Sequence, residues 1–153
     1  MRRKEKEITD KTDIEAIIEQ SMVCKLGMIR NGNTPYIVPL CFGYQDHTLY
    51  FHSALKGLKI DCLEINPKVC FEFDMIAEPQ EAEDPCDWGM KYQSVIGFGK
   101  AEFIEESDDK RRALDVIMAQ YSDKPFEFPA NKVQATAVFK VEIESMTGKQ
   151  SGL

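Results

Sequence analysis

The sequence predicts a small antiparallel β-barrel with helices at its margins. About six segments have the alternating or continuous apolar pattern of strands. Most of them follow one another through turns too short for the crossover that parallel strands need. Neither the strand–helix alternation nor the glycine-rich fingerprint of a nucleotide-binding α/β fold is present. We therefore expect one mainly β domain over residues 1–153, with residues 1–8 forming a flexible arm.

The N-terminal half predicts one helix and then a meander of strands. Thr12 to Glu15 has the pattern of a capping box, and isoleucines at helical spacing follow it. Asn31-Gly32-Asn33 is typical of a hairpin turn, and the polar residues 45–47 of a second turn. The expected elements are a helix with Ile14, Ile17 and Ile18 buried, strands over 22–29 and 34–44, a third strand ending at His52, and a short helix closed by Asn66-Pro67.

The C-terminal half adds three strands and one helix. The acidic segment Glu78 to Asp87 contains two prolines and is expected to be a loop. Gly97 and Gly99 interrupt the longest strand, where they suit a bulge or a close backbone approach. Ser107 is expected to cap a helix. The expected strands cover 69–75, 90–105 and 136–144, with Phe139, Val141 and Ile143 facing inward.

Composition excludes several classes of function. The formal net charge of −7 argues against a nucleic-acid-binding or anionic-membrane-binding protein, because both need a basic face. No apolar run is long enough to span a bilayer, and no secretory signal is visible. The five cysteines are widely spaced, so we expect reduced thiols in a cytoplasmic protein and no metal site.

The segment from Tyr50 to Asp61 carries the strongest functional signal. A strand ends at His52 and Ser53 and leads directly into a helix that carries Lys56 and Lys59. The free N–H groups and the dipole of a helix N-terminus attract anions, and the lysines add positive charge within about one turn. The segment therefore predicts a phosphate-binding site, although surface lysines on a peripheral helix remain the alternative.

Other chemistry is less well supported by the residues. A hydrolytic dyad of His52 and Ser53 is disfavoured, because adjacent strand residues point to opposite faces. Residues 88–97, which include Trp88, lead into the long strand and could form one wall of a pocket for a planar ring. The alternative is that this cluster is a core strand in which the Trp88 side chain only fills space.

Taken together, these segments resemble the pyridoxamine 5′-phosphate oxidase-like flavin-binding split barrels, and within them the branch that includes nitroimidazole-resistance proteins. The resemblance spans roughly residues 8–149 and rests on the order and spacing of short motifs. These motifs are VPLCFGY at 38–44, LYFHSA at 49–54, GLK at 57–59, NPKVCF at 66–71, YQSVIGFGKA at 92–101 and MTGK at 146–149.

The resemblance implies a six-stranded antiparallel split β-barrel that forms a homodimer with FMN at the subunit interface. By analogy, the backbone of Val38, Pro39 and Leu40 contacts the flavin ring, and the segment His52 to Lys59 holds the ribityl chain and phosphate. Ser53 and Lys59 are then the phosphate ligands, and His52 orients the flavin or a substrate as the catalytic residue. The complete cofactor set adds Ala54, Ser94 and Val95, with Trp88 and Tyr92 expected in the partner's pocket.

The chain departs from true pyridoxamine phosphate oxidases in two places. Gly57-Leu58-Lys59 stands where arginine–lysine is expected, and the tail Lys149-Gln150-Ser151-Gly152-Leu153 has no arginine for a substrate phosphate. We therefore expect an FMN-dependent oxidoreductase that reduces a small electron-poor substrate such as a nitroaromatic. The alternatives are a non-catalytic flavin-binding or flavin-sensing protein, a haem-binding split barrel that uses His52 or His47, and a deazaflavin in place of FMN.

Overall fold

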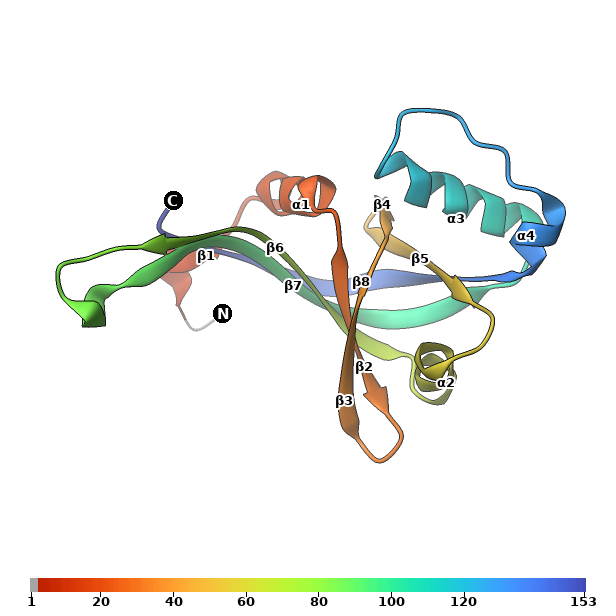
Figure 1. Ribbon diagram of the computed structural model, residues 1–153, viewed down its shortest axis with the longest axis horizontal. Coiled ribbons are helices and arrows are strands. Elements are labelled where there is room, and N and C mark those ends of the chain that lie inside the picture. The colour runs from red at the N-terminus through yellow and green to blue at the C-terminus, as the bar shows by residue number, and fades with distance from the viewer. Residues whose placement is uncertain (1–2) are drawn as a thin grey trace.

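The protein is a mainly β split barrel built on one antiparallel sheet of eight strands (Figure 1). The computed structural model describes residues 3–153, apart from the side chains at positions 76 and 77. The strand order is β3-β2-β6-β7-β8-β5-β4, and β1 pairs with β8. The strands are β1 Glu7–Ile8, β2 Cys24–Arg30, β3 Thr34–Leu40, β4 Gly43–Gln45, β5 Thr48–Ala54, β6 Lys68–Gln80, β7 Gly89–Ile104 and β8 Thr136–Ser151.

The predicted count of six strands was too low for two reasons. The expected strand over 34–44 breaks at Cys41 and Phe42 into β3 and β4, which pair with different neighbours. The predicted arm over residues 1–8 also ends in a strand, because Glu7 and Ile8 pair with Lys149 and Gly148 of β8. Burial of the Ile8 side chain explains why these residues are held against the sheet.

Helices cover the sheet at three places (Figure 1). In the view of Figure 1, α1 and α3 lie above the sheet and α2 lies below its right half. None of the helices within residues 3–153 is long and apolar enough to cross a membrane. The helices are α1 Lys11–Gln20, α2 Leu58–Ile65, α3 Ser107–Ala119 and α4 Ala130–Gln134, with single 3₁₀ turns at Lys4–Lys6 and Pro85–Asp87.

Two predicted helix caps were assigned to the wrong residue. The cap of α1 is Asp10, whose Oδ1 accepts a 2.8 Å hydrogen bond from the Thr12 backbone N–H. Helix α3 begins after Glu106, so that Ser107 lies inside the first turn instead of capping it. The Asp10 carboxylate thus caps α1, whereas no side chain caps α3.

The barrel core is filled by aromatic side chains from β5, β6, β8 and the connection between β3 and β4. Their alternation with outward-facing residues follows the two-residue period of a strand, as predicted for β6 and β8. The rings of Phe51 and Phe139 stack with centroids 5.1 Å apart, and those of Phe42 and Phe73 lie 4.9 Å apart. The largest side chains of this core are Phe42, Phe51, Phe71, Phe73 and Phe139.

Strand pairing extends beyond two predicted ends. Strand β6 continues to Gln80, and Glu78, Pro79 and Gln80 pair with the first residues of β7, so the predicted loop over 78–87 is shorter. Strand β8 continues to Ser151 because β7 offers it a partner from Tyr92 to Ile104. The β6–β7 hairpin consequently forms a long arm at the left of Figure 1.

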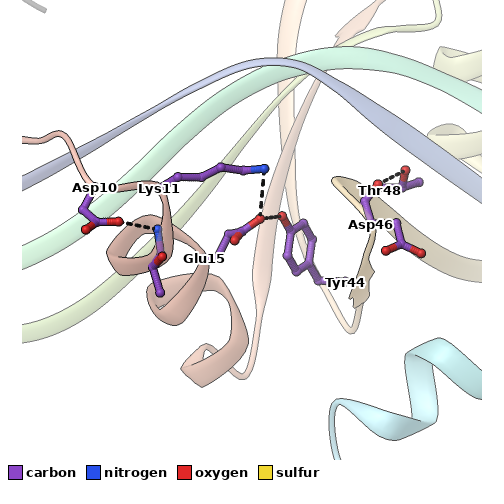
Figure 2. A network of polar contacts seen from close by, with 7 residues as sticks. Asp10, Lys11, Glu15, Tyr44, Asp46 and Thr48 are labelled. Atoms are coloured by element: carbon purple, nitrogen blue, oxygen red, sulfur yellow. Dashed lines mark hydrogen bonds and ion pairs between the residues drawn. The ribbon is translucent and has the colours of Figure 1, made fainter.

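Side-chain hydrogen bonds fix the helices to the strand connections. Figure 2 shows Tyr44 of β4 pointing at Glu15 of α1, to which its hydroxyl donates a 2.7 Å hydrogen bond. Lys11 lies 3.6 Å from the same carboxylate. Tyr121, just after α3, accepts from the Phe42 backbone N–H at 2.9 Å and donates to the Met22 carbonyl at 3.1 Å. Helices α1 and α3 are thus both anchored to the region where β3 breaks.

Candidate functional site

The junction between β5 and α2 is built from local backbone geometry. His52 and Ser53 occupy adjacent positions of β5, opposite Val138 and Ala137 of β8, so they point to opposite faces of the sheet. The chain then turns at Gly57, whose φ of +141° is a conformation that favours glycine. Gly57 is also the N-cap of α2, and no side chain caps this helix end. Lys59 therefore stands in the first turn of α2, with free backbone N–H groups beside it.

His52 and Lys59 are brought close enough to influence each other. Partial burial and the charge of Lys59 lower the pKa of the His52 imidazole. Partial burial also lowers the pKa of the Lys59 ammonium. Within residues 3–153 neither side chain makes an ion pair or a hydrogen bond. A charged lysine beside a neutral histidine at an uncapped helix start is an arrangement that favours an anion.

The predicted ring-contact segment lies in β3. The side chains of Val38 and Leu40 pack against the barrel core, whereas Pro39 between them is exposed. The Pro39 ring and the backbone of this segment are therefore the parts that face most directly outward. This is compatible with the backbone role that the resemblance implies for residues 38–40.

The predicted residues of β7 lie far from the anion site. Tyr92 pairs with Ser151 at the end of β8, whereas Ser53 pairs with Ala137 near its beginning. The two positions are separated by on the order of 40 Å of strand. Trp88 lies at the arm, about half exposed, and its indole N–H donates to the Ala82 carbonyl at 2.8 Å. One chain therefore does not bring Trp88 and Tyr92 to His52 and Lys59.

Ser94 and Val95 differ in what they can offer a ligand. Val95 is completely buried in the core, so its side chain is not free to line a cofactor on the outside of the barrel. Ser94 is half-buried opposite Lys149, on the other face of the strand. Any cofactor contact by Val95 would have to use its backbone.

The cavities of the described chain lie elsewhere. One of four cavities, of about 760 Å³, lies between α3 and the sheet and is lined by Tyr50, Phe103, Lys140 and several carboxylates. Sequence reasoning missed this cavity, because its shape depends on how α3 packs against the sheet. The acidic residues that line the cavity fall mostly at the start of α3, where the helix dipole favours them. None of the four cavities, of about 330 to 760 Å³, is lined by a predicted cofactor-binding residue.

Comparison with known proteins identifies the family of this fold. Residues 10–150 match the family model described as pyridoxamine 5′-phosphate oxidase. The chain belongs to the pyridoxamine 5′-phosphate oxidase family. The predicted resemblance and the split-barrel fold are thereby confirmed.

Solved structures of this family extend the comparison. A candidate 5-nitroimidazole antibiotic resistance protein from Bacteroides thetaiotaomicron shares 39% identity, with 94% of this chain and 85% of that chain covered and a TM-score of 0.86. The flavocytochrome Anf3 from Azotobacter vinelandii shares 20% identity over 100% of this chain and 72% of its own, with a TM-score of 0.88. An FAD- and haem-binding protein from Mycobacterium smegmatis shares 18% identity over 97% and 74%, also with a TM-score of 0.88. No curated protein matches the chain.

Proposed function

We propose that this family member binds a flavin, FMN, and holds its phosphate at the junction of β5 and α2. The observation that carries the proposal is the pair of unpartnered basic groups, His52 and Lys59, at the uncapped start of α2. A phosphate would compensate the charge of Lys59 and would accept hydrogen bonds from the free N–H groups of the helix. An acidic chain has no general reason to concentrate positive charge at this point.

Each residue has a defined task in this proposal. Lys59 and Ser53 hold the phosphate, and Ala54 supplies backbone beside it. The exposed Pro39 and the backbone of Val38 and Leu40 face the ring. The flavin supplies the transfer of electrons to the substrate, while the protein supplies binding and orientation. His52, largely neutral near pH 7 because its pKa is lowered, is able to donate or accept a hydrogen bond to orient the flavin or the substrate.

We further propose that the reaction is the reduction of a small electron-poor substrate of the nitroaromatic class. The relative at 39% identity is a candidate 5-nitroimidazole antibiotic resistance protein, which supports this substrate class. Turnover of nitroimidazole with a nicotinamide electron donor tests it. Flavin binding without any turnover would favour a flavin-binding or flavin-sensing protein instead.

A second copy of the chain completes the site in this proposal. The junction of β5 and α2 borders none of the four cavities described above, and in this proposal one chain supplies the phosphate site while its partner helps to enclose the ring. Trp88 and Tyr92 lie too far away to close the pocket of their own chain and are free to serve that of the partner. The functional unit is then a homodimer with FMN at the interface.

The absorption spectrum and the mass of the co-purified ligand test the cofactor. We expect a flavin spectrum and the mass of FMN. A Soret band would assign haem, and the mass of a deazaflavin would replace FMN while keeping the phosphate site. A chain that neither carries a flavin nor takes up added FMN would refute the proposal.

Lys59→Ala is the sharpest mutational test of the phosphate site. Loss of a charged hydrogen-bond donor should weaken FMN binding by about 10- to 100-fold. Lys56→Ala is the matched control, since Lys56 is exposed and lies in the turn before α2. It should change the affinity by less than about threefold, as expected for a distant screened charge. Equal effects of the two substitutions in a fluorescence titration would contradict the assignment of Lys59.

A further inference from the structure

An ionic cluster borders the exposed proline of the proposed ring site. Strand register places Lys25 of β2 opposite Pro39 of β3, and Glu72 of β6 opposite Lys25. Directly paired residues point to the same face of an antiparallel sheet, with Cβ atoms about 4.5–5.5 Å apart. Asp74, two residues further along β6, points to this face as well. The three charged residues Lys25, Glu72 and Asp74 are called the Lys25 cluster below.

Ion pairs across β2 and β6 hold the Lys25 cluster together. The Lys25 ammonium lies 3.1 Å from the Glu72 carboxylate and also contacts the Asp74 carboxylate. The three side chains are between 28% and 48% exposed. Ion pairs with that much exposure add at most about 1 kcal/mol to stability, because water screens them. A contribution to folding therefore accounts for little of this arrangement.

The cluster places its charges beside Pro39 and not farther along the same face. The next row across β3, β2 and β6 consists of Ile37, Gly27 and Cys70, none of which is charged. A lysine or carboxylate side chain is long enough to reach a group that contacts its paired neighbour. A ligand that contacts the outer side of Pro39 therefore meets one positive and two negative groups.

We propose that the Lys25 cluster sets the reduction potential of the flavin ring held at Pro39. A hydride from a nicotinamide donor brings two electrons and one proton, so a neutral ring that accepts it gains one negative charge. Lys25 stabilises that charge, whereas Glu72 and Asp74 destabilise it. Because a bound ring excludes water from this face, the three interactions are stronger there than in the unliganded chain.

The inference rests on the flavin site proposed above and adds how the chain adjusts the reducing power of the cofactor. Lys25 and its two partners act on the ring through their charge and take no part in transferring electrons or protons. Their effect is therefore visible in the equilibrium between oxidised and reduced flavin. That equilibrium is measured without any nitroaromatic substrate.

The midpoint potential of the FMN-loaded protein tests the inference with substitutions of opposite sign. Lys25→Met removes the positive charge and should weaken binding of reduced FMN about tenfold more than binding of oxidised FMN. For a two-electron couple this ratio makes the potential about 30 mV more negative. Asp74→Asn removes a negative charge and should make the potential more positive by a similar amount. Loss of a purely structural contact between Lys25 and Asp74 would not produce shifts of opposite sign.

Lys100→Met is the matched control for the loss of a lysine on this face. The Lys100 ammonium lies 3.7 Å from the Glu144 carboxylate, so this lysine is also part of an exposed ion pair. Its position on β7 is about 13 Å along the strand from Ile96, which pairs with Glu72. At that distance the charge is largely screened. The ratio of the affinities for reduced and oxidised FMN should change less than twofold.

Spectroelectrochemical titration of the wild-type chain and the three variants decides between the two proposals. Variants Lys25→Met and Asp74→Asn that bind FMN but keep the wild-type potential, or that shift it in the same direction, would overturn the inference and leave the flavin site standing. A shift in Lys100→Met as large as that in Lys25→Met would also overturn it. If Lys25→Met does not fold, the sign of the shift in Asp74→Asn decides alone. A wild-type chain that binds no FMN would overturn both proposals.

Discussion

His52 is held in its neutral form by its surroundings. Partial burial removes part of its hydration, and the nearby ammonium of Lys59 opposes a second positive charge. Both effects lower the pKa of the imidazole, so they act in the same direction. A bound phosphate would reverse the second effect, because a dianion favours the protonated ring.

This reversal predicts a ligand-dependent titration of His52. In the unliganded protein, NMR should give His52 a pKa below the ordinary value of about 6.5. Added FMN should raise that pKa, because the phosphate charge favours the protonated ring. The signal is assigned by its loss in His52→Gln. A pKa that is the same with and without FMN would place the phosphate elsewhere.

The same shift has a defined sign in the stability of the unliganded protein. Because the unfolded chain binds the His52 proton more readily than the folded chain does, the stabilisation is present above pH 6.5 and is lost as the pH falls toward the folded pKa. FMN, by raising the pKa of His52 in the folded protein, should reduce this loss of stability. The substitution His52→Gln should also reduce the loss of stability.

At the scale of single elements, the close approach of β6 and β7 depends on one missing side chain. A Cβ atom at Gly97 would lie 2.1 Å from the ring of Phe71, which is itself buried in the core. The strands can pair at this point only because the larger side chain on β6 faces a glycine on β7. The sequence indicated such an approach, and the structure identifies Phe71 as the partner.

Gly97→Ala should therefore destabilise the barrel. We expect a loss of about 1–3 kcal/mol in the free energy of unfolding, because the Phe71 ring has no free space into which to move. Gly89→Ala, at the start of the same strand, is the control, since its Cβ would lie 3.5 Å from the nearest atom. Denaturant unfolding monitored by circular dichroism measures both. Equal stability of the two variants would show that the core accommodates the added methyl group at position 97.

Sequence reasoning located most elements but misplaced several ends. The Asn31-Gly32-Asn33 turn was predicted correctly, because residues that accept positive φ are a local signal; Gly32 and Asn33 have φ of +79° and +60°. Pro79 suggested a loop, yet it pairs with Met90 because β7 supplies a partner strand along its full length. Such pairing depends on residues distant in sequence, and local patterns do not contain it.

At the scale of the whole molecule, the candidate site is divided between distant parts of one chain. His52 and Lys59 were predicted together and do influence each other, because a strand end and the helix that follows it are local. The separation of Trp88 and Tyr92 from them could not be predicted, since it depends on the length of β8 and the register of β7. The alternation of strand residues did predict that His52 and Ser53 face opposite sides.

Flavin binding and assembly should therefore be linked in both directions, because pairing completes the flavin pocket and bound flavin favours the pair. Dilution of the protein until the pair dissociates should weaken FMN binding at least tenfold, because a monomer keeps the proposed phosphate site but loses the partner's share of the pocket. Lys59→Ala should bind FMN weakly and remain a dimer at high protein concentration. FMN titrations of the wild-type chain at several concentrations and of Lys59→Ala, together with the masses by light scattering, give the comparison. A monomer that binds FMN at wild-type affinity would show that one chain encloses the flavin.

Pairing of β1 with β8 joins segments that are synthesised at very different times. The ribosome adds Gly148 140 residues after its partner Ile8. Local hairpins such as β2–β3 and β6–β7 can form before then, because they close short loops. Until β8 arrives, β7 presents a long unpaired edge over an open core, which is the condition in which nascent β-proteins aggregate or need a chaperone.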